Sequence, residues 1–293
     1  MTDIRIIDRK NNKEIVESEF SSNFISFLYH SMLGRVLLTF IFARPYFSYI
    51  MGLYYKNSIS RHRVRPFIKK YKLDPKLLNR NFEDFFSRKE NVKIQREQNA
   101  FYATAEGKLR AFKIGEDGNL YAGDKRVAIR IKGNDYSMEK LLKSSLPKWA
   151  IGGYLLLYRL SMSDYHRYIY PVKGYCIRNK KIKGKLESVR KDAAYWRAFV
   201  QNKRELEYWE TKLGKIIHID IGAMLVGHIH NHKKKYFSEG EEKGYFSFGG
   251  SSIVEIVNSK VEIDADILKN TERGFETKIK IGERIAYGKT EKA

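Results

Sequence analysis

The sequence contains a single cysteine, Cys176, and only five prolines in 293 residues. One cysteine excludes an internal disulfide and a zinc site built from several cysteines, and it fits a reducing compartment. Acidic residues are also scarce, because 34 Asp and Glu stand against 56 Lys and Arg and leave a formal net charge of +22. This surplus predicts binding to a polyanion, either an anionic lipid surface or a nucleic acid.

Long apolar runs are absent as well. The longest uncharged stretch, residues 20–34, is shorter than the roughly 20 apolar residues that a membrane span needs, and it contains polar side chains. The first twenty residues alternate in charge and lack the apolar segment of a signal peptide. We therefore expect neither a transmembrane span nor a signal peptide.

The pattern of residues divides the chain into a helical N-terminal portion, residues 1–95, and a β-rich core, residues 96–293. Between residues 20 and 90, apolar and aromatic side chains recur at spacings of three and four, which predicts helices. The basic and aromatic residues of these helices suit a lipid surface, although a helix pair packed on its own core has the same pattern. Before the helices, Ile4–Ile7 predicts a short edge strand.

Beyond about residue 100, short β-prone runs alternate with Gly, Asn and Asp turns. One helix is predicted over Met138–Lys143 and a second over Lys203–Trp209. The fold class is therefore α+β, a helical membrane-associating portion followed by a β-rich catalytic core. The predicted strands are Val127–Ile131, Tyr154–Leu160, Lys215–Ile221, Ser252–Val257, Val261–Ile263 and Thr277–Ile281.

Two segments contain residue types that carry chemistry. In Gly249-Gly-Ser-Ser252, the glycines allow either a tight turn or the unusual backbone geometry in which a serine hydroxyl attacks the preceding carbonyl. In Asp164-Tyr-His-Arg167, which follows an apolar run, His166 is either a proton-transfer group oriented by a carboxylate or a structural histidine at a strand end.

Together with several other segments, these two resemble the phosphatidylserine decarboxylase family, and they occur in the family's order from about residue 20 to the end. The matching segments are Phe82-Glu-Asp-Phe-Phe-Ser-Arg88, Thr104-Ala-Glu-Gly-Lys108, Lys132-Gly-Asn-Asp-Tyr-Ser137 with Leu141-Leu142, Asp164-Tyr-His-Arg167, Asn202-Lys-Arg-Glu205, Ile221-Gly-Ala-Met-Leu-Val-Gly227 and Gly244-Tyr-Phe-Ser-Phe-Gly-Gly-Ser-Ser252.

The resemblance implies a chain that cuts itself. The Ser251 hydroxyl would attack the carbonyl of Gly250, giving a β chain, 1–250, and an α chain, 251–293, that begins with a pyruvoyl group derived from Ser251. This covalent cofactor would form a Schiff base with the amine of phosphatidylserine and accept the electrons released with carbon dioxide. The implied enzyme is a carboxy-lyase that makes phosphatidylethanolamine, with His166 as proton donor or positioning group.

The resemblance also implies partners and a location. We expect the protein to work as a peripheral protein at the cytoplasmic face of the cell membrane, on an anionic phospholipid surface, as a homodimer of processed protomers. The basic surplus fits such a surface. No nucleic-acid motif accompanies the charge, so no nucleic-acid partner is expected, and no metal is implied.

Three positions depart from the family pattern. Glu106 stands where the family has Asp, which moves a carboxylate one methylene further from the backbone. Ile169 replaces the family's second histidine, the base for cleavage, and cannot take a proton. Ser252 replaces the usual Thr.

A nearby cluster of histidines offers candidates for the missing base. Alternation along a strand would place His228, His230 and His232 on one face, where they form a solvated polar face, bind a metal, or supply His228 or His230 as a substitute base.

These departures keep other functions open. The chain could be an uncleaved, catalytically silent homologue that only binds membranes, for which Ile169 and Glu106 are the supporting features. It could also be a pyruvoyl decarboxylase of a soluble amino acid, which activity on free amino acids without lipid binding would indicate.

Overall fold

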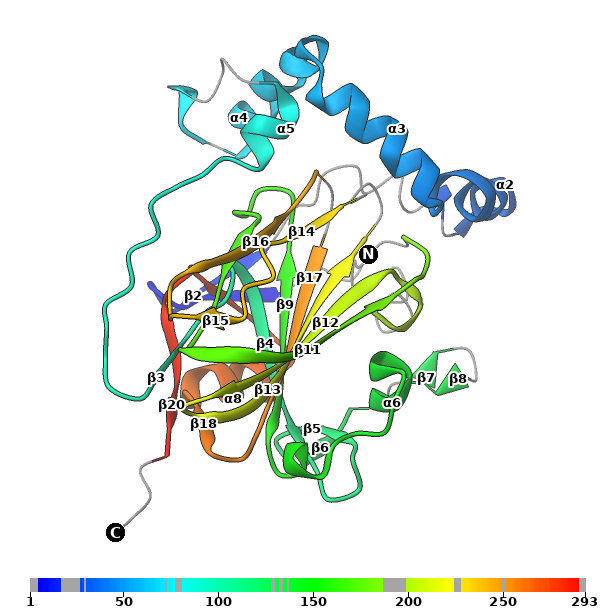
Figure 1. Cartoon of the computed structure of the whole chain (residues 1–293). Helices are drawn as coiled ribbons and strands as arrows, with labels where there is room; N and C mark the ends of the chain where they lie inside the picture. The colour runs from blue at the N-terminus through cyan, green and yellow to red at the C-terminus, as the bar shows by residue number, and fades with distance from the viewer. Residues whose placement is uncertain are drawn as a thin grey trace.

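The computed structural model describes most of the chain (Figure 1). The described residues are 5–16, 27–28, 30–71, 73–76, 81–127, 130–131, 134–135, 137–186, 199–223, 228–248 and 251–289. They form an N-terminal group of helices and a β-rich core, which confirms the predicted α+β fold class.

A twelve-stranded sheet organises the core. Its path runs β15-β11-β12-β13-β17-β9-β4-β19-β1-β2, with β5 and β6 added beside β4. The members are β1 (Arg5–Asp8), β2 (Lys13–Val16), β4 (Gly107–Ile114), β5 (Leu120–Ala122), β6 (Lys125–Arg126), β9 (Tyr154–Leu160), β11 (Gly174–Ile182), β12 (Arg204–Thr211), β13 (Gly214–Gly222), β15 (Tyr236–Phe237), β17 (Ser251–Val257) and β19 (Glu276–Ile279).

Smaller elements cover this sheet. Three-stranded sheets are formed by β10 (Arg167–Ile169), β16 (Glu242–Phe246) and β14 (Ile229–Asn231), and by β18 (Val261–Ile263), β20 (Arg284–Gly288) and β3 (Ala100–Tyr102). A two-stranded ladder joins β7 (Arg130–Ile131) and β8 (Asn134–Asp135). The helical pieces of the core are α6 (Met138–Leu142), η4 (Lys148–Ala150) and α8 (Ala265–Glu272).

Both faces of the central strands are buried. Along β17, Ile253 and Val257 pack into one apolar cluster, whereas Val254 and Ile256 pack into a second cluster with α6. Side chains alternate between the two faces of a strand, so a strand covered on both sides reads as a continuous apolar run. This explains why β17 and β9 were easy to find in the sequence.

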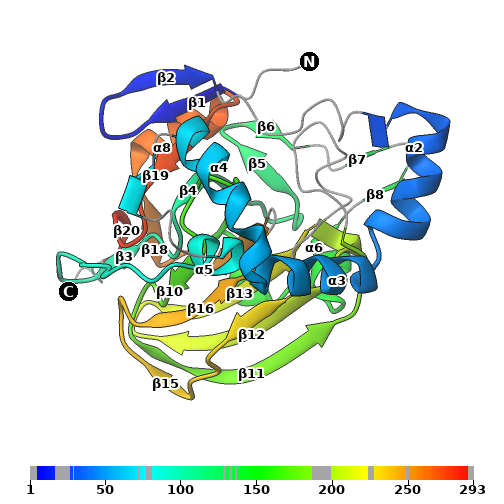
Figure 2. The same cartoon turned by 90° about the horizontal axis from the view of Figure 1, so that it is seen from above.

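The N-terminal helices gather at one end of the sheet, close to β14 and β16 (Figures 1 and 2). Their own core contains several aromatic rings and includes Phe248 from the β-rich core. These helices are α2 (Met32–Leu37), the π-helical η1 (Leu38–Phe42), α3 (Pro45–Lys56), η2 (Ser58–Arg63), α4 (Val64–Tyr71) and α5 (Phe82–Phe86).

Most predicted elements are confirmed. Strands occupy Tyr154–Leu160, Ser251–Val257 and Val261–Ile263, and β13 covers the predicted Lys215–Ile221. The helix over Met138–Lys143 is also confirmed as α6. The run at 277–281 is a strand only to Ile279. Of the run at 127–131, residues 128–129 lie outside the described residues.

The helix predicted over Lys203–Trp209 is wrong, because these residues form β12. The segment is rich in Lys, Arg, Glu and Leu, which favour helices locally. The neighbouring strands β11 and β13 supply backbone partners along its whole length. The inward-facing Glu207 is buried beside Lys243, and this tertiary contact outweighs local propensity.

The first strand is present but it is not an edge strand. β1 pairs in parallel with β19 and antiparallel with β2, so β2 is the edge. Residues 5–16 thus belong to the sheet of the core, although they lie in the segment that the sequence assigned to the helical portion.

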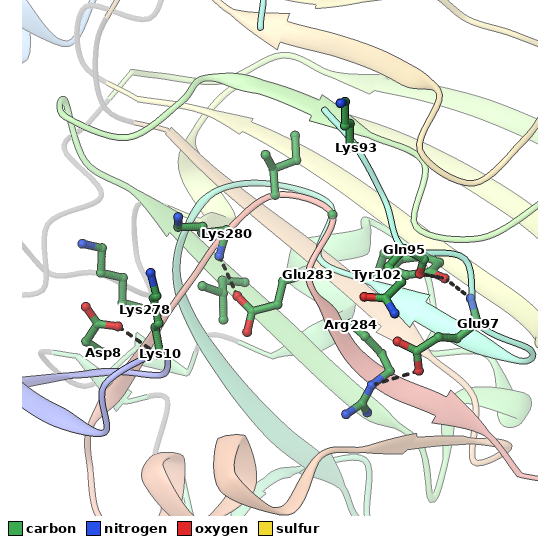
Figure 3. A pocket seen from close by; sticks show the side chains of 13 residues that line it. Asp8, Lys10, Lys93, Gln95, Glu97, Tyr102, Lys278, Lys280, Glu283 and Arg284 are labelled. Atoms are coloured by element: carbon green, nitrogen blue, oxygen red, sulfur yellow. Dashed lines mark hydrogen bonds and ion pairs between the residues drawn. The ribbon is translucent and has the colours of Figure 1, made fainter. Parts of the chain in front are cut away.

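A cavity of about 500 Å³ lies between this first hairpin, residues 93–97 and the turn from β19 to β20 (Figure 3). Its lining includes five basic and three acidic side chains, which leaves a positive balance. The lining does not include Ser251, His166, Glu106, His228 or His230. The cavity is therefore not where the sequence predicts the chemistry.

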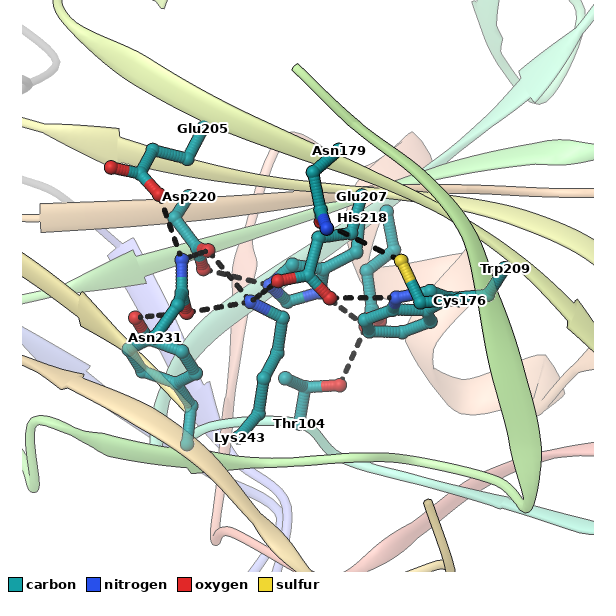
Figure 4. Close-up of polar contacts among 12 residues, drawn as sticks. Thr104, Cys176, Asn179, Glu205, Glu207, Trp209, His218, Asp220, Asn231 and Lys243 are labelled. Carbon is teal, nitrogen blue, oxygen red and sulfur yellow. Dashed lines mark hydrogen bonds and ion pairs between the residues drawn. The ribbon is translucent and has the colours of Figure 1, made fainter. Parts of the chain in front are cut away.

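A buried cluster of charged side chains joins the two sheets that meet at β16 (Figure 4). Lys243 of β16 is fully buried, and its Nζ lies 2.8 Å from Asp220 Oδ2 and 3.1 Å from Glu207 Oε1 in the large sheet. Burial alone would raise the pKa of the Asp220 carboxyl, but Lys243 and His218 outweigh it and hold that pKa well below its usual range.

The same cluster continues along β13 and β17. His218 contacts two carboxylates, through Nε2 to Asp220 Oδ1 at 2.7 Å and through Nδ1 to Glu255 Oε1 at 3.1 Å. Thr104 donates to Glu255 at 2.6 Å. Every charge in the cluster has a partner of opposite sign or a hydrogen bond, which is the condition for burying charge without large cost.

Helices α2, η1 and α3 expose apolar side chains to solvent. The exposed residues include Met32, Leu33, Phe40, Ile50 and Leu53. No single helix in the described part of the chain has the length and apolar composition to cross a membrane. Two helical stretches, Met32–Phe42 and Tyr46–Lys56, are joined by a 73° bend, and only together do they have that length and apolar composition.

Replacing Lys243 with Met tests the charged cluster. Without the ammonium, Asp220 and Glu207 lose their buried cation, and we expect the free energy of unfolding to fall by about 3–5 kcal/mol. Urea denaturation measures this change. The matched control is Lys215→Met on exposed β13 surface, expected to change stability by less than about 0.5 kcal/mol; equal effects of the two variants would contradict the prediction.

Candidate functional site

Ser251 is the first residue of β17, in the middle of the large sheet. It lies opposite Gly222 of β13 and Leu160 of β9, neither of which has a polar side chain. Ser251 is fully buried, and its Oγ has no hydrogen-bond partner among the described residues. Gly249 and Gly250, the residues before it, lie outside that set. The Ser251 hydroxyl is thus buried, with no hydrogen-bond partner in the described part of the chain.

The chain that leads to Ser251 is anchored by an aromatic residue. The ring of Phe248 lies 4.5 Å from Tyr55, 4.7 Å from Phe82 and 5.1 Å from Phe86, measured between ring centroids. These partners come from α3 and α5. The N-terminal helices therefore hold the segment immediately before the predicted cleavage bond.

Glu83 of α5 contacts the same segment, and the sequence motifs predict no role for its side chain. Its Oε2 accepts the Phe248 backbone N–H at 3.2 Å, and the residue is 6% exposed. Burial raises the pKa of this carboxyl. It also lines a small cavity of about 30 Å³ with His228 and Ser247. The sequence signal for such a residue is an acidic side chain between the apolar residues of a short helix.

His166 lies in the turn between β9 and β10, and its ring packs on Phe86 at 4.0 Å. Nδ1 is 2.8 Å from the carbonyl oxygen of Asp164, so Nδ1 carries the proton and donates it. Burial lowers the pKa of the ring to about 4. Nε2 has no partner among the described residues. His166 is thus a neutral imidazole with a free lone pair on Nε2.

Glu106 lies beside the residues that follow His166. Ala105 forms a β-bridge with Tyr168, and the side chain of Glu106 is half-buried. Burial raises the pKa of Glu106, and the nearby Asp164 carboxylate raises it further. Asp164 itself is bound by Lys108 Nζ at 2.8 Å. The Asp164 carboxylate is therefore neutralised by a bound cation, whereas the raised pKa of Glu106 favours its neutral form.

Ile169 occupies β10 and is 2% exposed. Its backbone N–H donates to the carbonyl oxygen of Thr104 at 2.9 Å, which brings the segments of Glu106 and Ile169 side by side. The side chain at 169 is apolar, so these two positions form no carboxylate–histidine pair. Position 169 therefore supplies no base.

Of the three histidines of residues 228–232, His228 and His230 lie side by side and His232 contacts a carboxylate. The rings of His228 and His230 are 5.8 Å apart, and His230 Nε2 is 3.1 Å from Ser247 Oγ. Burial lowers the pKa of both rings. His232 contacts Glu242 at 2.8 Å. In the described ranges, no group of three His, Cys, Asp or Glu residues is placed to hold a metal ion.

Comparisons with known proteins agree with the motifs. The sequence family described as phosphatidylserine decarboxylase matches residues 81–287. The phosphatidylserine decarboxylase proenzyme 2 of Clostridium acetobutylicum is 34% identical over 96% of this chain and 98% of its own length. Phosphatidylserine decarboxylase proenzymes of Clostridium perfringens and Chlamydia pneumoniae are 34% and 31% identical, over 96% and 97% of this chain and 99% and 97% of their own lengths.

Glu83→Ala tests the anchoring of the segment before Ser251. The buried Phe248 N–H would lose its acceptor, so we expect the free energy of unfolding to fall by about 1–3 kcal/mol. Glu83→Gln retains an acceptor oxygen and should restore most of the loss. Asp84→Ala, at the exposed neighbouring position, is the control, and urea denaturation is the measurement. A Gln variant as unstable as the Ala variant would show that the acceptor is not the cause.

Proposed function

The chain belongs to the phosphatidylserine decarboxylase family, and on that premise we propose that it converts phosphatidylserine to phosphatidylethanolamine and carbon dioxide after cutting itself between Gly250 and Ser251. The single observation that carries the proposal is the buried, unpartnered hydroxyl of Ser251 at the start of β17. It lies within the matched residues and directly after two glycines.

The surroundings of Ser251 fit a pyruvoyl group. After cleavage, residues 251–293 would begin at β17, which pairs with β13 and β9 along its whole length. The new chain end would therefore stay in the sheet, at the buried position of Ser251. A pyruvoyl group there supplies a carbonyl that takes the substrate amine and accepts the electrons released with carbon dioxide.

His166 and Glu106 are the proposed partners of this site. The Nε2 atom of His166 is free to hold or pass a proton near the substrate, and the hydrogen bond to Asp164 fixes the ring. Glu106 is a half-buried carboxyl whose raised pKa suits a proton-exchanging group. His228 and His230 are two further candidates for the missing cleavage base. They lie beside Ser247 and Phe248.

The N-terminal helices are the proposed membrane contact. Their exposed apolar residues stand beside the exposed basic residues Arg35, Arg44 and Lys56, a combination that binds anionic lipid surfaces. We place the protein peripherally at the cytoplasmic face of the cell membrane. We also propose that processed protomers assemble as a homodimer, for which the family resemblance is the support.

One observation favours a second candidate function. Ile169 removes the family's cleavage base, so an uncleaved homologue that only binds membranes remains the alternative. A decarboxylase of soluble amino acids would be distinguished by carbon dioxide release from free serine rather than from phosphatidylserine vesicles.

Ser251→Ala should stop self-cleavage, because the attacking oxygen is removed. Intact mass spectrometry of fresh protein should find two chains, 1–250 and 251–293, for the natural sequence and one chain of 34.4 kDa for the variant. Ser252→Ala is the matched control, since side chains alternate and Ser252 faces the other side of the sheet. An intact natural chain that stays whole over days would support the silent homologue instead.

Phe40→Glu with Ile50→Glu should weaken binding to phosphatidylserine vesicles. These side chains are 63% and 58% exposed, and each buries apolar surface worth about 1.5 kcal/mol or more in a lipid phase, so affinity should fall roughly tenfold for each. Vesicle sedimentation measures the loss. Ile177→Glu, at an exposed site on β11, should bind like the natural protein; equal loss in the control would argue against these helices as the contact.

A further inference from the structure

Self-cleavage at Ser251 needs a base that removes the hydroxyl proton, and Ile169 cannot provide it. The chain has seven histidines. His218 is buried, but both of its ring nitrogens contact carboxylates. His232 contacts Glu242, and Nδ1 of His62 contacts a backbone carbonyl. These three rings are therefore engaged by other groups, and His30 is exposed near the start of the N-terminal helices, whereas Ser251 is fully buried.

The two histidines beside the cleavage segment are also poorly suited. His230 Nε2 already contacts Ser247 Oγ at 3.1 Å. His228 is exposed beside α3, with its ring centroid 6.4 Å from that of Tyr49. The contacts of both rings are thus with Ser247 or α3, whereas Ser251 lies opposite Gly222 and Leu160 in the large sheet.

His166 is connected through its neighbours to both ends of the two-residue stretch that carries the cleavage bond. On one side, its carbonyl oxygen accepts the Phe246 N–H at 3.0 Å, and its ring packs on Phe86, which packs on Phe248. On the other side, the turn that contains His166 begins directly after Leu160, the cross-strand neighbour of Ser251. Only residues 249 and 250 separate these two anchored ends.

Three buried polar atoms at the cleavage site lack a partner among the described residues: His166 Nε2, Ser251 Oγ and Ser252 Oγ. Buried polar atoms without partners are rare in folded proteins and usually have a functional explanation. Alternation along β17 places the side chains of Ser251 and Ser252 on opposite faces of the sheet. The hydroxyl of Ser251, next to the cleavage bond, is a donor and His166 Nε2 is an acceptor lone pair, so each provides what the other lacks.

We propose that His166 Nε2 is the general base for self-cleavage at Ser251, in addition to its role in decarboxylation. The inference rests on the proposed function, because it assigns a residue to the maturation step. The hydrogen bond from Nδ1 to Asp164 fixes the tautomer that leaves Nε2 unprotonated. Burial is the main reason that the imidazole stays neutral, because it lowers the pKa of the ring; Asp164 opposes this shift, whereas Arg88 and Lys108 add to it.

The step balances in atoms and charge. Nε2 removes the proton of Ser251 Oγ while this oxygen bonds to the carbonyl carbon of Gly250. The imidazolium then gives the proton to the Ser251 nitrogen while the bond between that nitrogen and the Gly250 carbonyl carbon breaks. The product is an ester with a free amine, and His166 is neutral again. No oxidant or reductant is needed.

His166→Asn is the most informative variant, because the Asn amide replaces Nδ1–H toward Asp164 but offers nothing at the Nε2 position. We expect its cleavage rate, followed by intact mass spectrometry after cell-free synthesis, to fall at least about 100-fold, the usual contribution of a general base. A thermal unfolding curve checks that the variant is folded. His232→Ala is the histidine control, expected to cleave like the natural chain.

Chemical rescue separates a base from a structural residue. His166→Gly should be isolated as the uncleaved chain, and added imidazole should start cleavage, faster above the pKa of imidazole than below it. A residue that only packs on Phe86 would show no such rescue.

Four outcomes decide the matter. Slow cleavage of His166→Asn with rescue of His166→Gly supports the proposal. Cleavage of His166→Asn at the natural rate overturns it while leaving the proposed function intact. Loss of cleavage in His228→Ala/His230→Ala with normal cleavage in His166→Asn assigns the base to that pair instead. A natural chain that never cleaves overturns the proposed maturation and this inference together.

Discussion

The contact between Lys243 and the two carboxylates of Asp220 and Glu207 holds the rest of the site in register. It connects β16, in a three-stranded sheet, to β13 and β12 of the large sheet. β16 leads into residues 247–250, and β17 begins at Ser251. The ion pair therefore fixes one end of the cleavage segment, and the sheet fixes the other. A buried ammonium tolerates little displacement from its carboxylates, because an unpaired charge in this environment costs several kcal/mol.

The N-terminal helices complete this constraint from outside the sheet. Phe248 is packed among aromatic rings of α3 and α5, and Glu83 binds its backbone N–H. The same α3 exposes apolar residues on its other side. One helix thus contacts the segment before Ser251 with its buried face and exposes apolar side chains on the opposite face.

The altered positions have a consistent physical consequence. With Ile169 in place of a histidine, β10 packs tightly and the neighbouring Glu106 has no imidazole to polarise. Its pKa is raised rather than lowered, as expected for a half-buried carboxyl near the Asp164 carboxylate. Ser251 and His166 nevertheless have buried polar atoms with no partner in the described part of the chain. The altered position therefore removes one imidazole, while a second imidazole stays buried close to the segment before Ser251.

Sequence alone determined the features that depend on local order. Apolar runs located β9, β13 and β17, and short motifs in a fixed order indicated the family, Ser251 and His166. Tertiary structure alone decided the remainder. β12 is a strand because β11 and β13 flank it and Lys243 neutralises Glu207. Glu83 matters because it meets Phe248, which lies 165 residues further along the chain. The motif singled out His166, but its burial against Phe86, which lowers the pKa of its ring, depends on residues that are close in space and distant in sequence.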